Sequence, residues 1–132
     1  MTNMKNLLAL LLFTAAISLS FTSSTFSTKV EWLTDTKHDF GVLMHKQPGV
    51  HYFSYKNISG EPLTVDNIRT TCGCTSPEWE DIVIMPDSTG IIKIEYDAQK
   101  LGYFQKFAKV FFHGQKKSEK LVIEGEVIEN DE

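Results

Sequence analysis

Short segments rich in β-branched and aromatic residues alternate with turn-forming segments from residue 30 onward. The alternation of apolar and polar positions is clearest at 91–96, where Ile92, Ile94 and Tyr96 alternate with Lys93 and Glu95. Successive side chains of a strand point to opposite faces, so this segment predicts a strand with one apolar and one polar face.

The same pattern returns near the C-terminus. Leu121, Ile123 and Val127 alternate with Glu124 and Glu126. Strands with one apolar and one solvated face are typical of antiparallel sheets that pack face to face. No segment has sustained helical periodicity, and we predict an all-β fold, an immunoglobulin-like antiparallel β-sandwich of about seven to eight strands.

Glycine and proline clusters separate the expected strands, because glycine allows positive φ and proline fixes φ and lacks an N–H donor. The strands are expected at residues 30–33, 38–43, 51–57, 63–70, 82–85, 91–96, 104–112 and 121–127. The core between the sheets is expected to contain Phe40, Phe53, Ile68, Ile92, Ile94, Val110 and Ile123.

The N-terminus has the pattern of a signal peptide. Lys5 gives a basic start, 7–17 is an uninterrupted apolar run, and Ser18 and Ser20 suit the −3 and −1 positions of a cleavage site. The run is about half of the ~20 residues that cross a bilayer, which favours a cleaved signal peptide over an uncleaved anchor. We therefore expect an exported protein, in the periplasm, in the cell envelope or secreted, with no transmembrane anchor after cleavage.

The domain boundaries follow from these patterns. We expect a signal peptide at 1–20, a flexible lead-in at 21–29, one sandwich domain at 30–128 and an acidic tail at 129–132. The net charge is −4, and Arg69 is the only arginine. This charge balance argues against a nucleic acid as partner.

The sequence offers little support for catalysis. No nucleophile-elbow pattern surrounds any serine, and a sandwich of this size fills its interior with side chains. We expect no enzyme and no resident cofactor. The acidic segment 78–81 surrounds Trp79 and is expected to be an exposed loop anchored by that ring.

The segment Thr71–Thr75 reads Thr-Cys-Gly-Cys-Thr and is the one place with specific chemistry. Two cysteines of an exported protein usually form a disulfide, and Gly73 is expected to permit the tight turn that a Cys-x-Cys bridge needs. A bridge that closes so small a ring is expected to be reducible. Two thiolates on one turn also suit a soft metal such as copper(I) or zinc. Cys72 and Cys74 thus have three interpretations at this stage: unreactive thiols, a disulfide, or a metal site.

Topology indicates which side chains lie near the cysteines. Loops alternate between the two ends of a sandwich, so the cysteine loop should share an end with loops 44–50 and 97–102. Met44 and His45 are then the expected additional metal ligands, with His51 as a further histidine candidate. His113 is expected at the opposite end.

The chain also resembles a known family. The elements His-Asp-Phe-Gly at 38–41, Lys-Asn-Ile-Ser-Gly-Glu-Pro-Leu at 56–63, Thr-Cys-Gly-Cys-Thr at 71–75, Tyr-Asp at 96–97 and Ile-Glu-Gly-Glu-Val at 123–127 carry the resemblance. They resemble the exported bacterial family of domain of unknown function 1573, which is similar to the immunoglobulin-like domains named after ASPM, SPD-2 and Hydin. The resemblance implies a fold and a compartment, but no activity.

Two functional hypotheses follow. The first is a non-enzymatic exported domain that binds an unknown protein or cell-envelope component through edge strands and end loops. The alternative is a thiol redox or soft-metal (copper or zinc) protein that acts through Cys72-Gly73-Cys74.

Overall fold

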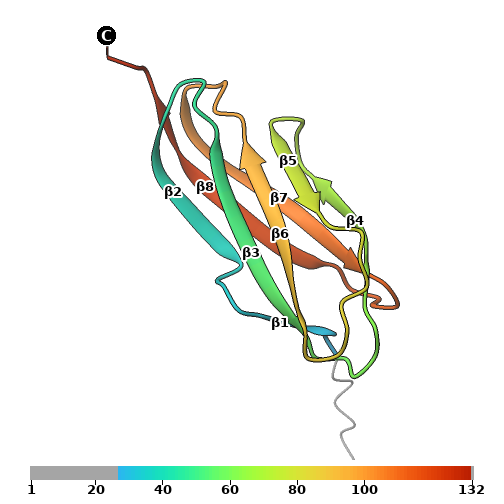
Figure 1. Cartoon of the computed structure of the whole chain (residues 1–132). Coiled ribbons are helices and arrows are strands. Elements are labelled where there is room, and N and C mark those ends of the chain that lie inside the picture. Colours follow the sequence, from blue (N-terminus) through green and yellow to red (C-terminus); the bar gives the residue numbers. More distant parts are fainter. Residues whose placement is uncertain (1–26, 132) are drawn as a thin grey trace, which may run out of the picture.

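The computed structural model describes residues 27–131, which form eight strands in two packed sheets (Figure 1). The strands are β1 (Val30–Trp32), β2 (Lys37–Met44), β3 (Gly49–Asn57), β4 (Val65–Thr70), β5 (Thr75–Trp79), β6 (Thr89–Tyr96), β7 (Gly102–Phe112) and β8 (Glu119–Ile128). No helix in this part of the chain is long and apolar enough to cross a membrane. The predicted signal peptide lies outside the described residues.

Each sheet has four strands. The first, sheet A, has the order β1-β3-β6-β5, and the second, sheet B, has the order β2-β8-β7-β4. The chain changes sheets between its first two strands, since β1 pairs antiparallel with β3, whereas β2 pairs parallel with β8. All other pairs are antiparallel, and the predicted immunoglobulin-like sandwich is confirmed.

The predicted core is also confirmed. Phe53, Ile92 and Val110 are fully buried between the sheets. Ile68, Ile94 and Ile123 are buried with them, and Phe40 is half-buried and packs against this cluster. The polar side chains of β6 and β8 face outward, as the alternation predicts.

One predicted strand is wrong. Residues 82–85 form only an isolated bridge between Ile84 and Leu63, and the fifth strand is instead β5. The sequence of β5 contains Pro77, which removes a donor and argues against a central strand. Here β5 is an edge strand, where such a proline is tolerated. The acidic segment 78–81 therefore begins within a strand, and Trp79 packs against the core as expected.

Candidate functional site

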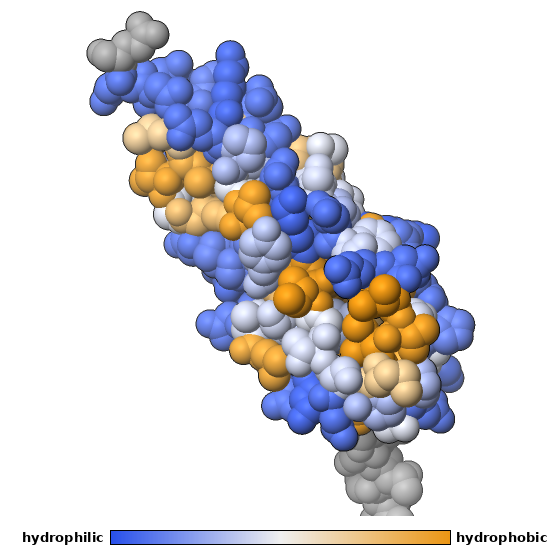
Figure 2. Space-filling view, in the orientation of Figure 1, coloured by the Kyte–Doolittle hydropathy of each residue, from blue (hydrophilic) through white to orange (hydrophobic). Residues whose placement is uncertain are grey.

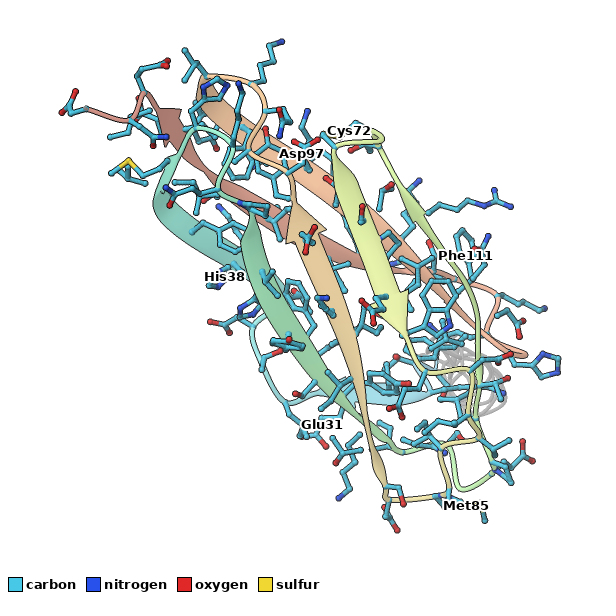
Figure 3. All side chains as sticks on the ribbon, turned by 45° about the horizontal axis from the view of Figure 1, so that its top comes forward. Glu31, His38, Cys72, Met85, Asp97 and Phe111 are labelled. Atoms are coloured by element: carbon cyan, nitrogen blue, oxygen red, sulfur yellow. A yellow bond between two sulfur atoms is a disulfide. The ribbon has the colours of Figure 1, made fainter. Side chains whose placement is uncertain are left out.

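The cysteine turn connects the edge strand of sheet B to the edge strand of sheet A, between β4 and β5 (Figure 3). The Thr70 hydroxyl donates to the Cys72 carbonyl at 3.1 Å, and the Thr75 N–H donates to the same oxygen at 3.4 Å. The Thr71 N–H donates to the Phe107 carbonyl of β7 at 3.2 Å. The flanking threonines thus define the turn, because their hydroxyls and N–H groups bond its backbone.

The two sulfur atoms lie within bonding distance of each other, and the Cα atoms of Cys72 and Cys74 are 5.3 Å apart. The Thr75 hydroxyl is buried beside them, 3.6 Å from Cys72 Sγ and 3.9 Å from Cys74 Sγ. Both cysteines are half-buried, and Cys74 packs against the core. The pair is therefore held by the fold and remains partly open to solvent.

The expected role of Gly73 needs a correction. Its φ is not positive, and a Cβ atom added there would meet nothing within 4 Å. The turn therefore does not require glycine for steric reasons, since left-handed φ or close contact is what excludes other residues. The hydrogen bonds of Thr70 and Thr75 to the Cys72 carbonyl hold the turn.

The loops predicted to share this end do lie there. The Asp97 N–H donates to the Cys74 carbonyl at 3.0 Å, and Asp97 and Cys72 lie at the same end of the domain in Figure 3. The Lys46 N–H donates to the Ala98 carbonyl at 2.9 Å. The loop after β2 and the loop after β6 are thus joined, and the second of them is joined to the cysteine turn.

His45 lies in this loop cluster but has other partners. Its Nε2 is 3.2 Å from the Gln99 carbonyl and its Nδ1 is 3.6 Å from a Glu129 carboxylate oxygen. Met44 ends β2 and is partly exposed. Residues 27–131 contain no group of three or more His, Cys, Asp and Glu side chains placed to hold a metal ion. The ligand set Cys72, Cys74, His45 and Met44 stays a prediction.

His51 is positioned differently from what the loop argument suggests. Its ring stacks on that of His38, with centroids 3.6 Å apart and planes 9° apart. The pair joins β3 of sheet A to β2 of sheet B, with the rings of Phe53 and Phe40 edge-on at 4.6 Å. Burial, and to a lesser degree the charge of His38, lowers the pKa of His51. His51 thus belongs to the seam between the sheets.

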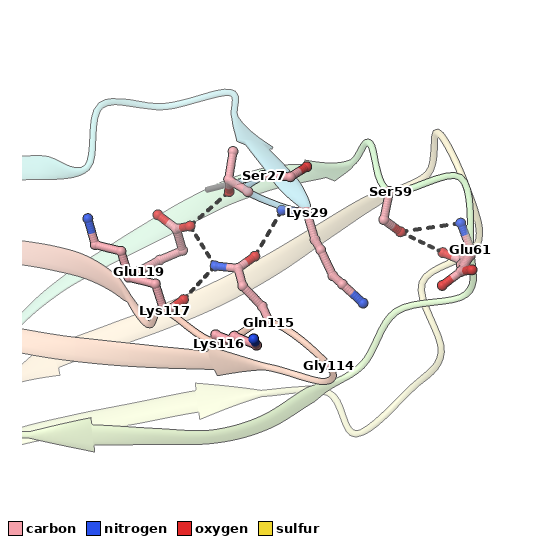
Figure 4. Close-up of a pocket in the computed structure, with 10 residues that line it drawn as sticks. Ser27, Lys29, Ser59, Glu61, Gly114, Gln115, Lys116, Lys117 and Glu119 are labelled. Carbon is pink, nitrogen blue, oxygen red and sulfur yellow. Dashed lines mark hydrogen bonds between the residues drawn. The ribbon is translucent and has the colours of Figure 1, made fainter. Parts of the chain in front are cut away.

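His113 lies at the other end, as predicted. The backbone N–H of His113 donates to the Thr64 carbonyl, and its ring Nδ1 is 3.1 Å from Asp66 Oδ1. Close by, a polar recess of about 680 Å³ contains Gln115, which accepts from the Lys29 N–H and donates to Glu119 (Figure 4). Several of its polar groups bond one another through Gln115.

The sheet edges are a feature that sequence reasoning did not locate. Edge strands expose unpaired backbone groups, which proteins usually protect with bulges, prolines or short strands. Here β1 has three residues, and β2 and β4 each contain a register shift. At the shift in β2, Gly41 has a φ of 65° and donates its N–H to Asp39.

Strand β5 is protected by Pro77. The Asp97 N–H to Cys74 carbonyl bond places Thr75, Pro77 and Trp79 at the non-hydrogen-bonded positions of the β5–β6 ladder. The backbone nitrogen of Pro77 therefore faces outward, where an N–H would otherwise be exposed.

Two half-strands of sheet A are not protected in these ways. Because β1 pairs only with residues 55–57 of β3, the N-terminal half of β3 has no strand of the described residues paired on that side. Because β5 ends opposite Ile92, the first residues of β6 have an open side as well. Both openings depend on pairing across the sheet, so no local sequence signal identifies them.

The comparisons with known proteins agree with the fold. The chain is similar to an ASH/PapD-like domain of human CEP192, with a TM-score of 0.70, 12% identity, and coverage of 86% of this chain and 94% of that domain. A protein of unknown function from Porphyromonas gingivalis W83 has a TM-score of 0.64 and 16% identity. That match covers 81% of this chain and 51% of the Porphyromonas protein.

The secreted serine protease VesC from Vibrio cholerae has a TM-score of 0.58 and 9% identity, over 78% of this chain and 24% of the protease. The chain thus spans about half of the Porphyromonas protein and a quarter of the protease. At these identities the likeness concerns the fold alone. No curated protein sequence matches this one.

The sequence also matches a family model. The model describes a protein of unknown function, DUF1573, and it matches residues 30–127, which include all of β1 to β7 and most of β8. The chain therefore belongs to the DUF1573 family, and its fold is the immunoglobulin-like sandwich that the resemblance implied.

Proposed function

We propose that this chain is an exported, non-enzymatic immunoglobulin-like module that binds another protein or a cell-envelope component through open strand edges of sheet A. The observation that carries the proposal is the contrast between its edges. Three edge strands and the short β1 are protected, whereas half of β3 and the start of β6 have no strand of residues 27–131 paired with them on one side. Addition of a partner strand to an open edge is a common mode of protein recognition.

The side chains next to the β3 opening suit a partner. Val50 is 40% and Tyr52 is 55% exposed, and both lie on the outward face of β3. The β1–β3 ladder bonds the Leu33 N–H to the Ser54 carbonyl, so the alternating positions 50 and 52 turn their backbone groups to the open side. An apolar strand that paired here would bury both side chains.

Export is part of the same proposal. It is supported by the apolar run at 7–17 and by the small residues that follow it. The measurement is fractionation of cells that express the full chain, with mass spectrometry of the N-terminus. Retention of Met1 on cytoplasmic protein would contradict export.

Affinity capture tests the binding role. The tagged chain is used to capture partners from the envelope fraction and is compared with Tyr52→Pro, which removes an outward N–H without removing a ladder bond. Tyr52→Phe is the matched control, and circular dichroism verifies that each variant is folded. We expect Tyr52→Pro, and not Tyr52→Phe, to lose partners that the parent retains. Capture of the same partners by all three forms would contradict binding at this edge.

A second candidate function rests on the cysteine turn. The two sulfurs lie within bonding distance and are partly exposed, which suits thiol–disulfide exchange. A partner dithiol would reduce the Cys72–Cys74 bond to two thiols. It would give up two electrons and two protons and itself become a disulfide. Titration of thiols with and without reductant, together with metal analysis of anaerobically purified protein, separates a disulfide from a metal site. Thiols that are reduced, metal-free and unreactive in the native protein would remove this candidate.

A further inference from the structure

The start of β6 borders a cavity that the early end of β5 leaves open. The last pair of the β5–β6 ladder is Trp79 with Ile92, whereas β6 extends back to Thr89. A cavity of about 450 Å³ lies at this place, lined among others by Tyr55, Trp79, Ile82, Ile84 and Ile91. Apolar side chains gather on the surface below the end of β5 (Figure 2).

The backbone of β6 turns unpaired groups toward this cavity. Glu95 and Lys93 face β5 in the ladder, and alternation gives Ile91 and Thr89 the same direction. Glu80, which would be the next partner of Ile91, lies beyond the end of β5, and no backbone bond joins the two. Two residues of an otherwise central strand thus offer N–H and C=O groups to a ligand.

The side chain of Tyr55 lines the same cavity. Tyr55 is 3% exposed, and its ring lies between the sheets with its centroid 5.0 Å from that of Phe112. The ring passes over Gly90, where a Cβ atom would clash with Tyr55 Cζ and the hydroxyl oxygen. The hydroxyl therefore reaches the cavity only because position 90 has no side chain.

This hydroxyl lacks a protein partner. It forms no hydrogen bond within residues 27–131, although it is not sealed off from solvent. Burial raises the pKa of Tyr55 to about 12, so the group is a neutral donor at physiological pH. A hydroxyl that has no protein partner and retains access to the cavity can donate to a ligand in place of water.

The rim of the cavity is acidic. Glu78 and Glu80 line it, together with Lys93, whose Nζ is 3.0 Å from Glu78 Oε2. The single cation is thus paired, and Glu80 is exposed with no cation within ion-pair distance among the described residues. A positively charged ligand complements this rim.

We propose that this cavity is a peptide-binding site, at which an extended basic segment of a protein partner pairs with Thr89–Ile91 and places a hydrogen-bond acceptor on the Tyr55 hydroxyl. The proposal rests on the binding function above and names the chemistry of the partner: backbone in strand conformation, lysine or arginine toward Glu80, and an inward side chain such as glutamine. Alternation along the ligand strand permits this, since neighbouring residues point inward and outward in turn.

The test uses three short capped peptides as probes. The first has the sequence Val-Lys-Gln-Lys-Val, the second replaces both lysines by glutamate, and the third is the basic peptide N-methylated at its three central amides. Amide and indole NMR shifts of Ile91 and Trp79 report the site, and the titration gives the affinity. We expect the basic peptide to bind at least about tenfold more tightly than either of the others at low salt.

Two variants locate the interaction. Tyr55→Phe keeps the ring and removes only a hydroxyl that has no internal bond, so it should fold, and it should weaken the basic peptide about five- to tenfold. Tyr103→Phe, which removes an exposed hydroxyl on β7 outside the lining of this cavity, should leave the affinity unchanged. Equal binding of the N-methylated peptide, equal binding by Tyr55→Phe, or no shift at millimolar peptide would overturn the proposal.

The envelope capture distinguishes failure of this site from failure of the general function. If the parent and Tyr55→Phe retain the same partners, the chain is a binding module and the cavity is not its site. If the parent retains no partner, the binding function itself fails.

Discussion

At the scale of the residue, burial on alternating positions determines which side chains matter for stability. Ile94 is 1% exposed, whereas Ile91 on the same strand is 55% exposed. Truncation of Ile94 to alanine should lower the free energy of unfolding by about 2–5 kcal/mol, since it removes buried methyl groups and leaves a cavity. Ile91→Ala is the matched control and should change it by less than about 0.5 kcal/mol. Urea denaturation measures both, and equal effects would mean that the inward face is misassigned.

The stacked histidines are the second feature at this scale. The pKa of His51 is lowered in the folded domain, by burial first and by His38 second, so the unfolded chain takes up this proton at higher pH than the folded one. The contribution of His51 to stability is therefore present above its ordinary pKa of 6.5 and is lost as the pH falls below that value.

We expect the free energy of unfolding to decrease as the pH falls below 6.5, in step with this titration. His51→Gln should flatten that part of the profile, as measured by urea denaturation across the pH range. His113→Gln, at the opposite exposed end, is the control and should leave it in place. A parent profile with no decrease in this range would contradict the lowered pKa of His51.

At the scale of the element, Pro77 has two effects on β5. It weakens the sequence pattern that would predict a strand, and it protects the strand edge from pairing with another chain. Its position in a short, charged segment weakens the strand pattern, and only the pairing with β6 reveals that the missing N–H faces solvent. Tertiary pairing thus overrides a local signal, as is usual for edge strands.

This arrangement predicts a specific effect of Pro77→Thr. The substitution restores an outward N–H on a flat edge, so the variant should self-associate more than the parent, seen as a sedimentation coefficient that rises with protein concentration. Ser76→Thr is the control, because the N–H of residue 76 faces β6. Equal sedimentation of the parent and both variants would show that another feature protects this edge.

At the scale of the whole molecule, the sequence was sufficient for the sandwich and for the end at which the cysteines lie. Alternation along β6 and β8 identifies the inward faces, and the parity of the loops predicts that the cysteine turn meets the loops after β2 and β6. The cavity beside Tyr55 could not be predicted from the alternation of side chains or from the order of the loops. It depends on Gly90 lying opposite Tyr55 in the β3–β6 register, whereas glycine in a turn-like segment reads only as a turn residue.

The contribution of the cysteine pair to the whole domain is the last prediction. A bond between residues 72 and 74 closes a loop of only three residues, and the loss of chain entropy for so short a loop corresponds to about 1.6 kcal/mol. Domains of this kind usually unfold with about 5–15 kcal/mol, which the packed core supplies here. The double variant Cys72→Ser/Cys74→Ser should therefore stay folded and lose no more than about 1.6 kcal/mol in urea denaturation. The parent measured with excess dithiothreitol should show the same loss, since reduction opens the same loop. An unfolded double variant would make the pair a structural staple, whereas a folded one leaves its chemistry as the reason for two cysteines on an exposed turn.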